Sequence, residues 1–114
     1  MRIRGPDYEV TYDSKTATLT FSGVLRLNRV EYAPIVRLLG GVAGLKPALI
    51  TVDLQELKFL NSSGVSVVSK FVIQVRKLKV SQVLVLGSKK ISWQRKSLKN
   101  LQKLMRHIQV EWMA

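Results

Sequence analysis

The sequence predicts an α/β fold: a single domain over residues 1–114, in which one mixed β-sheet starts with an N-terminal hairpin, continues through helix–strand repeats and packs against helices. Three observations lead to this prediction. Residues 8–21 alternate apolar and polar side chains, residues 48–54 are almost continuously apolar, and residues 63–78 place apolar side chains at every third or fourth position.

The hairpin is expected at residues 8–21, where two alternating runs flank the turn-forming triplet Asp13-Ser14-Lys15. A first helix is expected from about Val30 to Val42, because apolar residues recur there at helical intervals and Pro34 is close enough to the start to be tolerated. The glycines Gly40, Gly41 and Gly44 are expected to end this helix.

The second half of the chain repeats strand and helix. Ala48–Leu54 is expected to be a strand buried on both faces and covered by helices. Residues 63–78 are expected to form a helix despite their many valines, because the span is long for a strand. Residues 81–87 predict another buried strand, and Ser92 is a candidate cap for a final helix with Leu98, Leu101, Met105 and Ile108 on its inner side. Residues 109–112 are expected to close the sheet.

The composition narrows the range of functions. There is no cysteine, so neither a disulfide framework nor a thiolate metal site is available. No uncharged run reaches the ~18 residues that a membrane span needs, and we expect a soluble, cytoplasmic protein. The net charge is +12, and no acidic residue lies between Leu57 and Val110, so the second half carries a positive potential that would speed encounter with an acidic protein, a nucleic acid or an anionic membrane.

A polar turn, Leu60-Asn61-Ser62-Ser63-Gly64, joins the apolar strand to the long helix that follows it. The N–H groups at a helix start favour negative charge, so a phosphate on Ser62 or Ser63 would be stabilised there. Serine is also a preferred N-cap, and one of the two serines is expected to cap the helix.

The order of the elements, together with this turn, resembles the STAS family, typified by bacterial anti-sigma-factor antagonists, over nearly the whole chain. Members of that family carry Asp-Ser-Ser-Gly or Asp-Ser-Thr-Gly between an apolar strand end and an apolar helix. Thr20–Leu25 is similar to the family's second strand, which commonly runs into Gly-x-Leu-Asp. Leu25–Asn28 and Lys96–Leu101 are also similar to small free-standing STAS-like regulators of cyanobacteria.

The resemblance implies a STAS-like mixed sheet and a regulatory function in bacterial signalling and transcription regulation. In the family, a serine kinase, often the anti-sigma factor itself, phosphorylates the first serine of the turn, and a phosphatase removes the phosphate. Ser62 corresponds to that serine, with Ser63 as the alternative. The unphosphorylated form binds its partner protein and frees a sigma factor.

Two positions depart from the family pattern. Asn61 replaces the aspartate of the turn, and Arg26 occupies the aspartate position of the earlier motif, with Asn28 two residues further on. The alternative reading is therefore a binding module that is never phosphorylated, such as a scaffold subunit of a membrane-associated complex. In either case the partner is expected to contact the turn and the polar side of the following helix: Arg26, Asn28, Asn61, Ser62, Ser63, Gly64, Ser66, Ser69 and Lys70.

A basic stripe is expected on the final helix, formed by Lys96, Lys99, Lys103 and Arg106. A solvated helix face is the favoured reading. A nucleic-acid surface is less favoured, because no nucleic-acid-binding fold signature or basic-aromatic platform accompanies the charge.

No enzyme activity, cofactor or metal is expected. His107 is the only histidine and is expected at a helix end on the surface, while Asp53 and Glu56 are explained as turn or solvent-facing residues. Gly87-Ser88-Lys89-Lys90 lacks the glycine spacing of a phosphate-binding P-loop. The oligomeric state does not follow from the sequence.

Overall fold

The computed structural model describes residues 1–104 and 108–114. The chain forms the strands β1 (Arg2–Arg4), β2 (Tyr8–Asp13) and β3 (Thr18–Leu25), then helix α1 (Ala33–Gly44). These are followed by β4 (Leu49–Leu60), α2 (Ser62–Leu78), β5 (Gln82–Ser88), α3 (Ser92–Leu104) and β6 (Gln109–Met113). The α/β fold, its N-terminal hairpin and the helix–strand repeats are confirmed.

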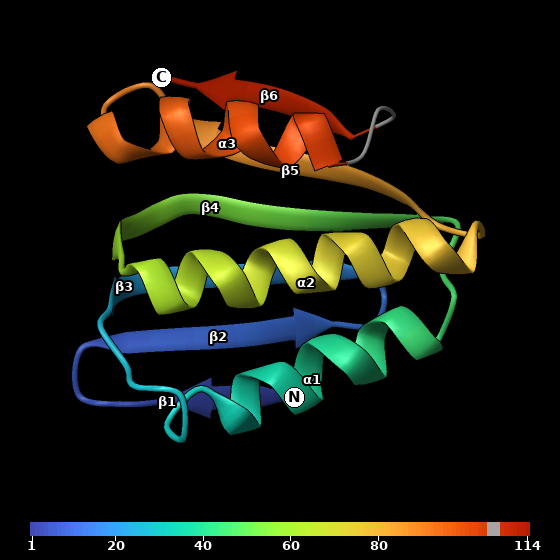
Figure 1. Ribbon diagram of the computed structural model, residues 1–114, viewed down its shortest axis with the longest axis horizontal. Helices are drawn as coiled ribbons and strands as arrows, with labels where there is room; N and C mark the ends of the chain where they lie inside the picture. Colours follow the sequence, from blue (N-terminus) through green and yellow to red (C-terminus); the bar gives the residue numbers. More distant parts are fainter. Residues whose placement is uncertain (105–107) are drawn as a thin grey trace.

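The strands form one mixed sheet in the order β1-β2-β3-β4-β5-β6. The pairs β1·β2 and β2·β3 are antiparallel, whereas the pairs β3·β4, β4·β5 and β5·β6 are parallel. Each parallel connection contains one helix, and a common handedness of these crossovers places the three helices on one face of the sheet (Figure 1). Within this layer α2 lies between α1 and α3 (Figure 1).

The core lies between the helix layer and the inner face of the sheet. Alternate strand residues such as Val10, Leu19 and Ile50 are buried there together with Leu39 of α1 and Val72 of α2. The residues between them on the strands, among them Thr11, Thr20 and Asp53, are only partly buried on the other face. The prediction that Ala48–Leu54 is buried on both faces is therefore wrong, because all three helices cover the same side.

Helix α1 also differs from the prediction at its end. The helix continues through Gly40 and Gly41, so these two glycines do not terminate it, whereas Gly44 is its last residue, as predicted. Buried residues on the same turns, Leu38, Leu39 and Val42, hold this part of the chain against the sheet. Tertiary packing therefore overrides the low helix propensity of glycine.

Strand β4 continues to Leu60, beyond its predicted end at Leu54. Its pairing with β5 stops at Asp53, and its pairing with β3 is irregular near Ser22 and Gly23. The fully buried Gln94 of α3 fills the gap that opens between β4 and β5. Its Nε2 donates to the carbonyls of Leu54 at 2.7 Å and Leu57 at 3.1 Å, and its Oε1 accepts the N–H of Ser88 at 2.8 Å.

Ser92, which the sequence offered as a cap, is the first residue of the final helix, and this helix buries Leu98 and Leu101 as predicted. Three residues with predicted positions lie outside the described residues. They are Met105, predicted on the inner side of the helix, Arg106, predicted on the basic stripe, and His107, predicted on the surface. Among the residues that the structure describes, no helix is long and apolar enough to cross a membrane.

Candidate functional site

Asn61 caps helix α2. Its backbone is extended (φ −74°, ψ 172°), and its Oδ1 accepts the N–H of Gly64 at 2.9 Å. The same oxygen accepts the hydroxyl of Tyr32 at 2.6 Å, and Nδ2 donates to the carbonyl of Leu27 at 2.9 Å. The expectation that one of the serines caps the helix is wrong, because Asn61 precedes them at the N-cap position and its short amide reaches the N–H of the third helical residue.

Gly64 permits α2 to start close to α1. The residue is buried, and a Cβ atom on it would overlap the Cδ1 of Leu60 and the hydroxyl of Tyr32. Tyr32 is itself only 2% exposed and is the N-cap residue of α1. Gly64 and Asn61 therefore join β4, α1 and α2 at this corner.

Ser62 and Ser63 are both exposed at the start of α2. Because Asn61 caps the helix, neither hydroxyl is needed for that purpose. A helix start leaves its first N–H groups without acceptors inside the helix, and the first turn of α2 contains no acidic residue. The two hydroxyls thus stand on a positive helix end that favours an added anion.

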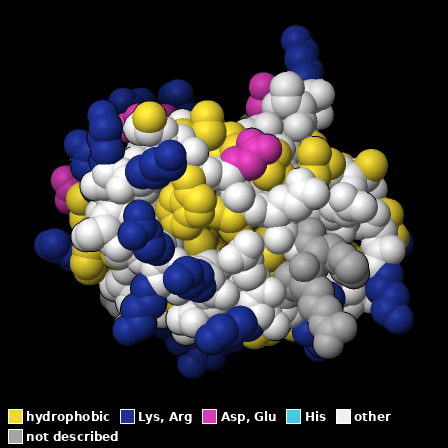
Figure 2. All heavy atoms as spheres, turned by 90° about the horizontal axis from the view of Figure 1, so that it is seen from above, with side chains coloured by type: hydrophobic (Ala, Val, Ile, Leu, Met, Phe, Trp, Pro, Cys, Tyr) yellow, Lys and Arg dark blue, Asp and Glu magenta, His cyan; other side chains and the backbone are white. Residues whose placement is uncertain are grey.

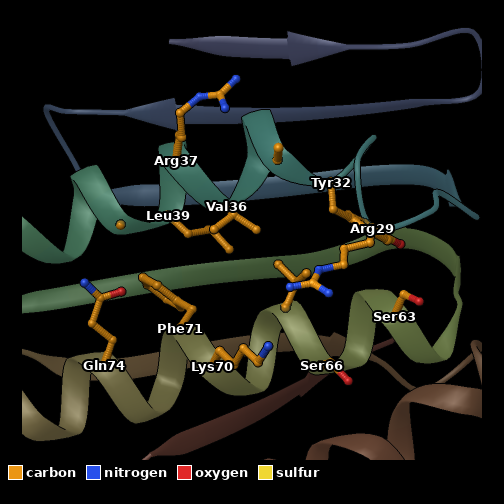
Figure 3. A pocket seen from close by; sticks show the side chains of 13 residues that line it. Arg29, Tyr32, Val36, Arg37, Leu39, Ser63, Ser66, Lys70, Phe71 and Gln74 are labelled. Carbon is orange, nitrogen blue, oxygen red and sulfur yellow. The ribbon is translucent and has the colours of Figure 1, made fainter.

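A groove of about 670 Å³ lies between α1 and α2, beside this turn (Figure 3). Its apolar part includes Val36 and Leu39 from α1 and Val67 and Phe71 from α2. Three cationic residues line it, namely Arg29, Arg37 and Lys70, together with Ser63, Ser66 and Gln74. In Figure 3 the guanidinium of Arg29 extends over the space between the helices, whereas Arg37 points away from α2.

The structure gathers some of the predicted partner-binding residues in this groove and leaves others outside it. Ser63, Ser66 and Lys70 line the groove, while Ser62, the first residue of α2, is not among the lining residues. Ser69 is half-buried and is not among the lining residues.

Arg26 and Asn28 lie on the loop between β3 and α1, at the edge where β4 ends. The guanidinium of Arg26 stacks on the ring of Phe59, 4.7 Å from its centroid. Asn28 and Glu31 exchange hydrogen bonds: Oδ1 of Asn28 accepts the N–H of Glu31 at 2.9 Å, and Oε1 of Glu31 accepts the N–H of Asn28 at 3.0 Å. Both residues therefore have contacts within the fold and form the border of the site.

Several groove residues were missed by the sequence analysis: Arg29, Val36, Phe71 and Gln74. Val36 is one of the apolar residues that predict the first helix, yet it is 49% exposed. The sequence did carry a signal for the exposure of Val36. The apolar stripe of this helix is wider than one contact with the sheet needs, and α1 buries Ile35, Leu38, Leu39 and Val42 without Val36.

Lys96, Lys99 and Lys103 are exposed on α3, as predicted, and Arg106 lies outside the described residues. Figure 2 shows many Lys and Arg side chains and few acidic ones on the face that is seen from above. Asp53 and Glu56 are on β4; Asp53 accepts hydrogen bonds from the backbone and side chain of Gln55. Within residues 1–104 and 108–114, no group of three or more His, Cys, Asp or Glu side chains could hold a metal ion.

No protein-family model matches the sequence, and no curated protein matches it. Solved structures nevertheless share its fold. The structure of the diguanylate cyclase SiaD in complex with its activator SiaC, from Pseudomonas aeruginosa, contains a chain that matches with a TM-score of 0.76 and 10% identity, over 99% of both chains.

SiaC of Pseudomonas aeruginosa also matches by itself, with a TM-score of 0.72 and 10% identity over 99% of this chain and 98% of that chain. An anti-sigma factor antagonist from Mycobacterium paratuberculosis matches with a TM-score of 0.65 and 20% identity, over 94% of this chain and 90% of that chain. The STAS-like fold predicted from the sequence is confirmed by this likeness.

Proposed function

We propose that this chain is a regulatory protein-interaction domain that resembles an anti-sigma-factor antagonist and binds its partner with the start of α2 and the adjoining groove. The observation that supports the proposal most strongly is that the two serines of the turn are exposed and do not cap the helix. Asn61 caps the helix and Ser62 and Ser63 remain exposed, so the hydroxyls are accessible without a structural duty. No cofactor or catalytic step is required for this function.

The fold is shared with two kinds of regulatory protein. One is an anti-sigma factor antagonist, and the other, SiaC, is an activator found in complex with the diguanylate cyclase SiaD. Both support binding to another protein as the function of the present chain. The partner class that we propose is a serine kinase resembling an anti-sigma factor, with a phosphatase acting in opposition, in the cytoplasm.

Phosphorylation of Ser62 is the proposed switch. A phosphate adds about −1.5 to −2 charge at neutral pH, and its interaction with a helix start is worth about 0.3–1 kcal/mol. The folded domain therefore tolerates it. Burying the same charge without a partner at an interface costs several kcal/mol, so the phosphorylated domain is expected to release its partner.

The switch is tested by comparing Ser62→Ala and Ser62→Asp in binding to the partner protein purified from the native cell. The proposal predicts that Ser62→Ala binds like the wild type and that Ser62→Asp loses binding. Ser92→Asp is a matched control, because it places the same charge at the exposed start of α3. Loss of binding in this control as well would show that the charge acts non-specifically.

The second candidate is a scaffold that binds without phosphorylation, for example in a membrane-associated complex. It is favoured by the hydrogen bonds of Asn61, whose amide is engaged with Gly64, Tyr32 and Leu27 where the family has a carboxylate near the acceptor serine. Equal partner binding by Ser62→Ala and Ser62→Asp would favour this candidate.

A further inference from the structure

The groove between α1 and α2 carries positive charge without any compensating acid. Neither helix contains an Asp or Glu residue, and the residues that line the groove include Arg29 and Lys70 but no acidic side chain. Glu31, the acid nearest in sequence to Arg29 and α1, accepts the N–H of Asn28 on the loop. A ligand for this groove therefore has to bring negative charge.

The same groove exposes apolar surface. Val36 on α1 is 49% exposed, whereas the apolar residues Ile35 and Leu39 of the same helix are buried, and in Figure 3 Val36 faces α2 on the same side of the groove as Leu39. The partly buried Val67 continues this apolar surface on α2, whereas Phe71 beside it is only 4% exposed. An apolar strip in the same groove as the cationic residues Arg29 and Lys70 matches a partner that is itself amphipathic.

Gly40 leaves open space in the wall of the groove. The residue lines the groove from inside α1, and a Cβ atom on it would meet no atom within 4 Å. Nothing in the chain itself requires a glycine there, although glycine is unfavourable inside a helix. A missing side chain in a groove permits the close approach of a second backbone.

We propose that the α1–α2 groove binds an acidic amphipathic helix of the partner protein. Its apolar stripe covers Val36 and Val67, and carboxylates beside the stripe pair with Arg29 and Lys70. A purely apolar segment would leave these two cations uncompensated, and a nucleic acid would leave the apolar strip uncovered. The inference rests on the proposed function, since it names the part of the partner that the regulatory domain recognises.

The test starts from a displayed library of helical peptides with randomised surface positions, selected for binding to the full chain. Enriched peptides are expected to carry leucine, isoleucine or phenylalanine at helical spacing, flanked by Asp or Glu. The best of them is then labelled and its Kd is measured. If the library yields no binder, or binders without acidic residues, the inference is overturned.

Variants of the groove show where the peptide binds. We expect three variants each to raise the Kd of the peptide at least about tenfold: Arg29→Glu, Lys70→Glu and Gly40→Leu. Lys77→Glu and Gly41→Leu are the matched controls: Lys77 is an exposed lysine of α2 outside the groove, and Gly41 has open space like Gly40 but does not line the groove. Equal weakening by the controls, or none by the groove variants, would overturn the inference.

Binding of the native partner separates this inference from the proposed switch. Loss of the native partner by Gly40→Leu and not by Gly41→Leu supports the groove as the docking site. If the groove variants retain the native partner while Ser62→Asp loses it, the groove inference fails and the switch stands. If the groove variants lose the partner while Ser62→Asp retains it, the switch fails and the groove stands.

Discussion

Replacing Asn61 with alanine is expected to destabilise the corner where β4, α1 and α2 meet. The variant removes the cap on Gly64, the acceptor of the Tyr32 hydroxyl and the donor to the Leu27 carbonyl. Tyr32 keeps one acceptor, the carbonyl of Leu25 at 3.3 Å, so its buried hydroxyl is not left without a partner.

The size of the effect follows from these three hydrogen bonds. Loss of an N-cap costs about 1 kcal/mol, and the bond from Tyr32 contributes about another 1 kcal/mol. Leu27 is only partly buried, so water can reach its carbonyl in the variant. Loss of the hydrogen bond from Asn61 to this carbonyl therefore adds only about 0.5 kcal/mol. The free energy of unfolding is therefore expected to fall by about 2–3 kcal/mol, which lowers the Tm by about 10 °C in a domain of this size.

Urea unfolding followed by circular dichroism measures this change. Asn28→Ala is the matched control, because Asn28 also accepts a backbone N–H through its side chain but lies on an exposed loop. The control is expected to lose less than about 1 kcal/mol. If the free energy of unfolding of Asn61→Ala stays within about 0.5 kcal/mol of the wild-type value, the hydrogen bonds of Asn61 do not stabilise this corner.

Asn61→Asp separates the acceptor and donor roles of the amide. The carboxylate keeps the bonds from Gly64 and Tyr32 and gains from the positive helix start, but it loses the donor to Leu27 and faces that carbonyl with an oxygen. Its stability is expected to lie between those of the wild type and Asn61→Ala. A variant less stable than Asn61→Ala would contradict this ranking.

Three further changes test other parts of the account. Gly41→Ala is expected to raise the free energy of unfolding by up to about 1 kcal/mol, measured by urea unfolding, because the added methyl meets open space in a helix; a loss of stability would contradict this. Gln94→Leu is expected to cost about 2–4 kcal/mol in the same measurement, because it leaves the carbonyls of Leu54 and Leu57 without their buried donor, and a near-neutral effect would refute that role. Burial raises the pKa of Tyr32 above its ordinary value of 10.0, so the unfolded chain loses this proton first; the contribution to stability is present below pH 10 and is lost as the pH rises above it. Tyr32→Phe is therefore expected to make the alkaline fall in stability shallower, and an unchanged fall would contradict this assignment.

Much of the fold could be predicted from periodicity alone. The alternating hairpin and the three- and four-residue spacing of residues 63–78 correspond to real elements, even though the helix is rich in valine. The three-residue strand β1 carries too short a pattern to be recognised. The open outer face of the sheet was missed because a continuous apolar run does not show on which side the helices pack.

The candidate site was predicted only where the turn motif is local in sequence. Ser62 and Ser63 are exposed at a helix start, as a phosphate-accepting role requires. The hydrogen bonds from Asn61 to the carbonyl of Leu27 and from Gln94 to the carbonyl of Leu54 join residues that are distant in the chain. The groove likewise appears only when α1 and α2 are placed beside one another.

The central claim is that a charge at the start of α2 controls partner binding. The most direct measurement is mass spectrometry of the protein from its native cell, after separation of the free and the partner-bound fractions. The account predicts an unmodified chain in the bound fraction and one phosphate on Ser62 in the free fraction. A phosphate on Ser62 in the bound fraction, or no phosphate in either fraction across growth conditions, would contradict it.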